Sequence, residues 1–268
     1  TDTCGVAGSG RSRGKCDDGV RGDGTCACFG DVFSGSGCTN GTCPAGTVEN
    51  ATFDGYYNNA ACTPCDAGTF SAEGDDECTK CASGKFSAER ASECAICSAG
   101  SYSGPGANVC SSCAIRTYQD ETGSPNCKLA DAGFFVDSLG ASEQTACDAG
   151  KYSGSAASEC IACEAGTYQG ATGEFSCALA DAGFFVDSLG ASKQVACDAG
   201  KYSGSGAKAC IDCEAGTYQG ATGEFSCALA DAGFFVQADG ASEQTACDAG
   251  KYSGSGADEC VDCEAGTY

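Results

Sequence analysis

Residues 163–212 read CEAGTYQGATGEFSCALADAGFFVDSLGASKQVACDAGKYSGSGAKACID, and residues 213–262 repeat this stretch with eight changes in 50 positions. Internal copying of this kind determines the architecture of a chain before any other feature does. The stretch contains three related phrases, EAGTYQ, DAGFFV and DAGKYS, and each opens a module of 16 or 17 residues. The sequence therefore predicts a tandem array of short modules with a 50-residue super-repeat.

The cysteines upstream show the same register. CxxC pairs recur every 16 residues, at Cys62/Cys65, Cys78/Cys81, Cys94/Cys97 and Cys110/Cys113. Farther along, one module in three has lost both of its cysteines, and the same two residues replace them each time: Ala130 with Gln144, Ala180 with Gln194, and Ala230 with Gln244. An aromatic residue stands five positions beyond the second cysteine, or beyond the alanine that replaces it, in every one of these modules.

The paired losses distinguish between disulfides and a metal. CxxC followed by CxxC is typical of structural zinc sites. If each CxxC bound zinc, the absence of cysteine at Ala130 and Gln144 would leave half of a zinc site at Cys127 and another at Cys147. If disulfides instead join one CxxC to the next, the same two absences remove one complete disulfide and leave no cysteine unpaired. We therefore disfavour zinc and predict these disulfides: Cys65–Cys78, Cys81–Cys94, Cys97–Cys110, Cys113–Cys127, Cys147–Cys160, Cys163–Cys177, Cys197–Cys210, Cys213–Cys227 and Cys247–Cys260.

A thioredoxin-like redox role is disfavoured too, because it needs one CxxC beside a βαβ unit and no helical pattern is present. The segment from Cys43 to Thr47 opens a module of the same type with a longer loop, so Cys43–Cys62 is expected to close it. The expected fold class is small, disulfide-rich and β, an elongated rod of stacked short β-hairpin modules with almost no helix. A single module buries too little apolar surface to fold alone, so its neighbours must contribute.

Composition indicates the compartment. The chain has 268 residues, of which 26 are cysteine and 41 are glycine, with no tryptophan and no methionine. Cysteine at this level is typical of a disulfide scaffold in an oxidising, extracellular environment. Asn40 and Asn50 each begin an N-x-[ST] sequon, and we predict that both are glycosylated. A net charge of −23 excludes a nucleic-acid partner, and no apolar run is long enough to span a membrane.

The module without cysteines has two interpretations that the sequence leaves open. In one, Leu179, Phe184 and Val186 form a small hydrophobic plug that replaces the missing disulfide. In the other, these clusters form a surface that repeats every 50 residues, with Phe134, Phe184 and Phe234 as the candidate interface. Leu189 becomes Asp239 in the last copy, so that position is expected to be exposed.

Residues 1–38 have irregular cysteine spacing and end in Cys26-Ala-Cys28, nine further residues and Cys38. This segment resembles the end of an epidermal-growth-factor-like domain, incomplete at its N-terminus. The resemblance implies the disulfides Cys4–Cys26 and Cys28–Cys38, with the partner of Cys16 lying before Thr1. No Asp/Asn-Glu calcium signature precedes the domain, so calcium is not expected. Cys263 also lacks a partner in the sequence, and the chain is expected to be a mature product or a fragment of a longer one.

Residues 39–64 form an irregular first module and residues 65–268 the regular array. From residue 43 on, the repeated C-x-A-G-T-[YF]-S…C-x-x-C resembles the cysteine-rich repeats of ephrin-receptor-like segments and the first submodule of tumour-necrosis-factor-receptor repeats. This resemblance implies an extended rod of β-hairpin modules outside the cell. It does not determine function, because such repeats serve as receptor stalks, ligand-binding ectodomains, adhesins and fibre subunits.

No feature of the sequence supports catalysis. The chain has no histidine for acid–base chemistry, and no cofactor is expected. Copies that differ at eight of 50 positions present nearly identical faces at regular intervals, so the main prediction is a structural subunit of an extracellular filament or surface appendage that self-associates. The alternative is a receptor- or adhesin-like ectodomain that binds a protein ligand.

Overall fold

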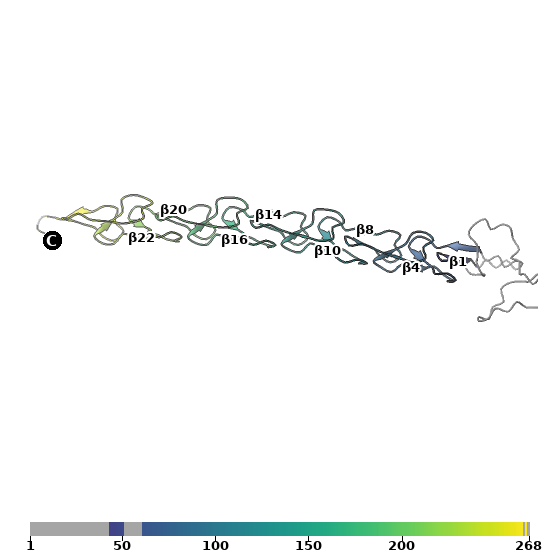
Figure 1. Ribbon diagram of the computed structural model, residues 1–268. Coiled ribbons are helices and arrows are strands. Elements are labelled where there is room, and N and C mark those ends of the chain that lie inside the picture. Colours follow the sequence, from purple (N-terminus) through teal and green to yellow (C-terminus); the bar gives the residue numbers. More distant parts are fainter. Residues whose placement is uncertain (1–42, 51–60, 265, 267–268) are drawn as a thin grey trace, which may run out of the picture. The chain divides into compact units, whose positions relative to one another are not determined.

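The structure, a computed structural model, describes residues 43–50, 61–264 and 266 (Figure 1). Within these residues it contains 26 short strands and no helix. The strands pair only as antiparallel two-stranded sheets, with one hairpin in each module. The predicted class, small disulfide-rich β-hairpin modules in tandem, is confirmed.

The described residues divide into two compact units. The first contains the modules up to Cys113 and residues 119–127, and the second contains residues 114–118 and the chain from Lys128 onward. The hairpins of the first unit are β1 (Thr47–Asn50) with β2 (Ala61–Pro64), β3 (Thr69–Phe70) with β4 (Thr79–Lys80), β5 (Lys85–Phe86) with β6 (Ala95–Ile96), and β7 (Ser101–Tyr102) with β8 (Ser111–Ser112).

The second unit continues the same series. Its hairpins are β9 (Thr117–Tyr118) with β10 (Lys128–Leu129), β11 (Phe134–Phe135) with β12 (Thr145–Ala146), β13 (Lys151–Tyr152) with β14 (Ile161–Ala162), β15 (Thr167–Tyr168) with β16 (Ala178–Leu179), β17 (Phe184–Phe185) with β18 (Val195–Ala196), β19 (Lys201–Tyr202) with β20 (Ile211–Asp212), β21 (Thr217–Tyr218) with β22 (Ala228–Leu229), β23 (Phe234–Phe235) with β24 (Thr245–Ala246), and β25 (Lys251–Tyr252) with β26 (Val261–Asp262).

The repeated phrase explains each hairpin. In the module that begins at Cys197, Gly200 has a φ of +83° and allows the tight turn that brings Lys201 N within 3.1 Å of Asp198 O. The first strand then ends at the aromatic position, and Tyr202 pairs with Ile211 on the second strand. The second strand consists of the two residues between the cysteines of a CxxC. Each CxxC thus ends one hairpin and opens the next.

Ten disulfides lie in the described residues, and from Cys65 onward each joins the cysteine that opens a module to the next cysteine along the chain. They are Cys43–Cys62, Cys65–Cys78, Cys81–Cys94, Cys97–Cys110, Cys113–Cys127, Cys147–Cys160, Cys163–Cys177, Cys197–Cys210, Cys213–Cys227 and Cys247–Cys260. They leave the modules of Ala130, Ala180 and Ala230 without a covalent bridge.

The core consists of small side chains. In most modules the cysteine that opens the module is fully buried, and a buried alanine takes its place at Ala130, Ala180 and Ala230. Directly after the aromatic residue, three positions past the turn glycine, a buried serine or valine completes the core, as at Ser153, Val186 and Ser203. Because no module buries a large apolar side chain of its own, its stability depends on its neighbours.

Backbone hydrogen bonds connect each module to the next one. In the second unit, Gly166 N donates to Val186 O at 2.8 Å, and Gly190 N donates to Cys163 O at 2.7 Å. Val186 N continues the series to Ala207 O at 3.0 Å. The same bonds recur at equivalent positions in both units. Neighbouring hairpins therefore satisfy each other's backbone groups, as expected of repeats that stabilise one another in sequence.

The turn glycine also contacts the module two places farther along. A Cβ added to Gly183 would lie 2.0 Å from the carbonyl oxygen of Gly223, and one added to Gly200 would lie 2.1 Å from that of Gly240. Real Cβ atoms do not approach a backbone oxygen so closely, so any side chain at these positions would force the modules apart. At Gly183 and Gly200 the glycine is thus favoured by both its φ and its packing, whereas Arg116 occupies the equivalent position in an earlier module at a φ of 77°.

Candidate functional site

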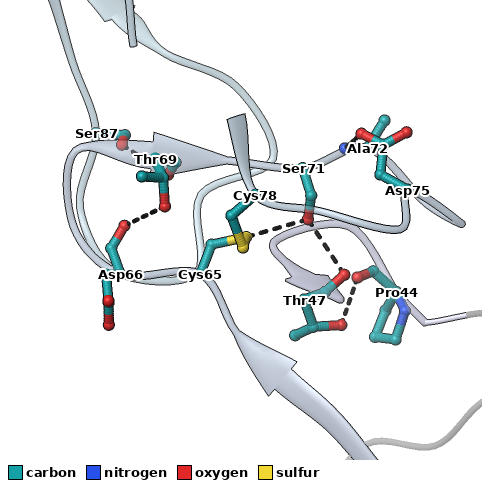
Figure 2. Close-up of a disulfide and its surroundings, with 10 residues drawn as sticks. All are labelled: Pro44, Thr47, Cys65, Asp66, Thr69, Ser71, Ala72, Asp75, Cys78 and Ser87. Carbon is teal, nitrogen blue, oxygen red and sulfur yellow. Dashed lines mark hydrogen bonds between the residues drawn. A yellow bond between two sulfur atoms is a disulfide. The ribbon is translucent and has the colours of Figure 1, made fainter. Parts of the chain in front are cut away.

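The surroundings of a disulfide show how hydroxyl side chains tie one module to the next (Figure 2). Ser71 is fully buried, and its Oγ lies 3.4 Å from Cys65 Sγ and donates to Thr47 O in the preceding module at 3.2 Å. Thr69 Oγ1 donates to Asp66 O within its own turn at 2.7 Å, and Ser87 Oγ donates to Thr69 O at 2.8 Å. The serine that follows the aromatic position therefore adds a side-chain hydrogen bond between modules.

The same serine bond recurs in the second unit. Ser153 Oγ donates to Phe134 O and Ser203 Oγ to Phe184 O, each at 2.8 Å, and Ser253 Oγ donates to Phe234 O at 2.6 Å. In each case the acceptor belongs to a module that lacks a disulfide. The disulfide-bonded module that follows therefore helps to hold the unbridged one in place.

The unbridged module is closed by a side-chain bridge that sequence analysis did not predict. Gln194 Oε1 accepts a hydrogen bond from Asp181 N, and Gln194 Nε2 donates to Asp181 Oδ2, both at 2.6 Å. Gln144 with Asp131 and Gln244 with Asp231 make the same two bonds at 2.7 Å. The pair joins the two ends of the loop that a disulfide closes elsewhere, and we call it the Gln–Asp bridge.

A serine adds a further bond in these modules. Ser205 Oγ donates to Ala180 O at 3.0 Å, and Ser155 and Ser255 do the same to Ala130 and Ala230 at 3.1 and 3.0 Å. Each alanine carbonyl also accepts the backbone bond that a cysteine carbonyl accepts elsewhere, for example from Gly206 N at 2.7 Å. The polar groups around the missing disulfide are therefore satisfied.

The predicted hydrophobic plug is right in one part and wrong in another. Val186 is 2% exposed and occupies the position that a buried serine holds in other modules. Leu179, the last residue of β16, is in contrast 60% exposed. Its side chain covers the turn at Gly206, where an added Cβ would lie 3.3 Å from Leu179 Cδ2. Valine and alanine thus form the plug, and the leucine covers the turn of a later module.

The candidate interface residues Phe134, Phe184 and Phe234 are half-buried on β11, β17 and β23. A Cβ added to Gly223 would lie 3.7 Å from the tip of the Phe184 ring, and Phe134 has the same relation to Gly173. These two rings therefore pack on the turn of the module two places farther along. These contacts lie within the chain, as the hydrophobic-plug interpretation expects. The role of the three phenylalanines as an interface with another molecule stays a prediction.

Other apolar side chains are more exposed and recur with the 50-residue period. Phe175 and Phe225 are 65% and 64% exposed. Leu189, expected at the surface because Asp239 replaces it, is 71% exposed but does not belong to the set, since the last copy has no apolar residue at that position. The remaining members are Leu129, Leu179 and Leu229, with Ile161, Ile211 and Val261. We call this set the repeated apolar positions. Side chains that stay in water in every copy are candidates for contacts with another protein.

Among the residues that the structure describes, no group of three or more potential metal ligands lies close together. In the same part of the chain no helix is long and apolar enough to cross a membrane. Cys263 has no disulfide partner among the described residues. The predicted pairs Cys4–Cys26 and Cys28–Cys38, the unpaired Cys16 and the sequon at Asn40 lie outside them. Asn50 is the last residue of β1, and its glycosylation stays a prediction.

Comparison with known proteins identifies the repeat. A family model described as tyrosine-protein kinase ephrin type A/B receptor-like matches residues 100–147, 150–197 and 200–247. The three segments together cover more than half of the 268 residues, and each contains one module with a Gln–Asp bridge. No curated protein matches the chain.

Proposed function

Because the chain belongs to the tyrosine-protein kinase ephrin type A/B receptor-like family, we propose that it is a non-catalytic, receptor-like ectodomain that binds a protein partner. The chain is extracellular, as its cysteine-rich repeats and disulfides indicate. The three tandem matches to a receptor-like family are the observation that carries the proposal.

The repeated apolar positions supply the surface for this binding. In the second unit the exposed Phe175 and Phe225 directly follow Glu174 and Glu224, so each exposed aromatic ring has a carboxylate as its neighbour in sequence. Exposed aromatic side chains contribute strongly to protein interfaces, and surrounding carboxylates favour a partner with basic groups. The excess of acidic over basic residues in the chain, 37 against 14, agrees with such a partner.

A binding assay on intact cells of the source organism tests this function. The fluorescently labelled chain is expected to bind them saturably, and mild protease treatment of the cells is expected to abolish binding. Changing Phe175 and Phe225 to serine together should weaken binding at least tenfold. Leu189→Asp is the matched control, because it places at an exposed leucine the residue found at the equivalent position 239. Absent or protease-resistant binding would refute the proposal.

A second candidate is a subunit of an extracellular filament, which the near identity of residues 163–212 and 213–262 favours. Identical surfaces at a regular spacing suit association of many copies, since one contact geometry can be repeated. Electron microscopy and sedimentation velocity over a range of protein concentration distinguish the two. Assembly into filaments without cell binding supports this second candidate, whereas monomers at high concentration exclude it.

A further inference from the structure

The covalent topology divides the modules of the second unit into two classes. In the module of Cys163 and Cys177, the disulfide shortens the covalent path, so the residues between the two cysteines bear no load when the chain is pulled. In the next module the covalent path runs through the whole loop from Ala180 to Gln194. Only noncovalent contacts keep that loop folded.

The two classes nevertheless share one backbone arrangement. Ala180 N donates to Gly166 O at 2.9 Å, just as Cys213 N donates to Gly200 O. Ala180 and Gln194 are 14 residues apart, the same separation as in the disulfide Cys163–Cys177. The Gln–Asp bridge joins Asp181 to Gln194, 13 residues apart, and so closes a loop of nearly the same size at the same place, by hydrogen bonds in place of a covalent bond.

The Gln–Asp bridge is partly exposed to water. The Asp181 side is exposed and Gln194 is half-buried, so water can replace both hydrogen bonds when the loop opens. A hydrogen bond that exchanges with water contributes little net stability, whereas a disulfide does not break under these conditions. When the chain is loaded, the modules with Gln–Asp bridges are thus the ones that can lengthen.

We propose that the three modules with Gln–Asp bridges are extension elements, which open reversibly under tension while the disulfide-bonded modules of the same unit stay closed. Each opening releases the loop of residues 130–144, 180–194 or 230–244. Fourteen residue steps at about 3.4 Å, less the closed distance between the loop ends, give a gain of about 40 Å for each module. The 50-residue period distributes the three elements evenly along the second unit.

Single-molecule stretching of the full, oxidised chain through terminal handles tests the proposal. The wild-type chain is expected to show three reversible lengthening events of about 40 Å each. The double variant Ala180→Cys/Gln194→Cys, with its new disulfide verified by non-reducing mass mapping, should show two. Leu189→Asp lies in the same loop and should keep all three, because the leucine side chain is 71% exposed.

A second, converse variant, which removes a disulfide, tests the proposal even if the engineered disulfide does not form. Cys213→Ala/Glu214→Asp/Cys227→Gln introduces the Gln–Asp bridge and its neighbouring alanine in place of the disulfide Cys213–Cys227, whose cysteines are 14 residues apart, and it should add a fourth event. Three events in the verified disulfide variant, or three in the converse variant, would overturn the proposal. So would a wild-type chain that shows no events of this length.

Discussion

The modules that begin at Cys163 and Ala180 are neighbours with the same hairpin and different closures. The first has a disulfide, and the second has the Gln–Asp bridge and a buried valine. Yet both make the same backbone hydrogen bonds to their neighbours. The comparison shows that the turn glycine and the bonds between modules determine the fold, whereas the closure adds stability to a geometry that is already specified.

The strongest way to break this common geometry is to change the turn glycine. Gly183→Ala places a Cβ 2.0 Å from Gly223 O at a φ of +88°, so strain and overlap both oppose it. We expect a loss of about 3 to 4 kcal/mol in unfolding free energy, measured by denaturant titration. Gly204→Ala is the matched control, since nothing lies within 4 Å of its added Cβ. Equal effects of the two variants would show that the close approach does not matter.

Removing a disulfide tests the first closure. Cys163→Ser/Cys177→Ser should lower the unfolding free energy by about 3 kcal/mol, because the unfolded chain regains the entropy of a loop of about 15 residues. Limited proteolysis should then cut the loop between these positions before it cuts the intact modules. Cleavage elsewhere first would mean that the disulfide is not what protects this module.

Removing the Gln–Asp bridge tests the second closure and should have a smaller effect. Gln194→Ala removes two hydrogen bonds that are partly exposed to water, so we expect a loss of about 1 to 2 kcal/mol by denaturant titration. Gln194→Glu should cost more at neutral pH, since it places a second carboxylate beside Asp181, and stability should recover on acidification as the introduced carboxyl group becomes protonated. A Glu variant without pH dependence would contradict the geometry of the bridge.

The smallest expected effect lies at an exception to the glycine pattern. Ala156 has a φ of +58° where the equivalent residues of later copies are Gly206 and Gly256. Ala156→Gly should relieve that strain and raise the unfolding free energy by about 0.5 kcal/mol, read from the shift of the denaturation midpoint. The neighbouring Ala157→Gly, without a positive φ to relieve, should lower stability instead.

Much of the fold follows from the sequence, because cysteine spacing is a strong one-dimensional signal. The register of the CxxC pairs and the aromatic position predicted the short hairpins and the absence of helix in the described residues. The Gln–Asp bridge was not predicted, although Asp181 and Gln194 and their equivalents recur together in all three copies. Their contact depends on how the turn directs the Asp side chain, which the spacing does not reveal.

Burial was harder to predict than register. Leu179 was expected in the plug because it is apolar, but each module is too thin to have an interior on that side, and its buried positions are filled by alanine, serine, valine and cysteine. The close approach of Gly183 to Gly223 was missed for a related reason. This contact joins modules two places apart, and the sequence of a repeat does not reveal which modules along the chain contact one another.

Disulfide mapping of the native protein by mass spectrometry without reduction tests the central claim most directly. The account predicts peptides that link Cys163 to Cys177 and Cys197 to Cys210, with no bridge across the module between them. Bonds within a CxxC, such as Cys160 to Cys163, or cysteines bound to a metal would contradict it.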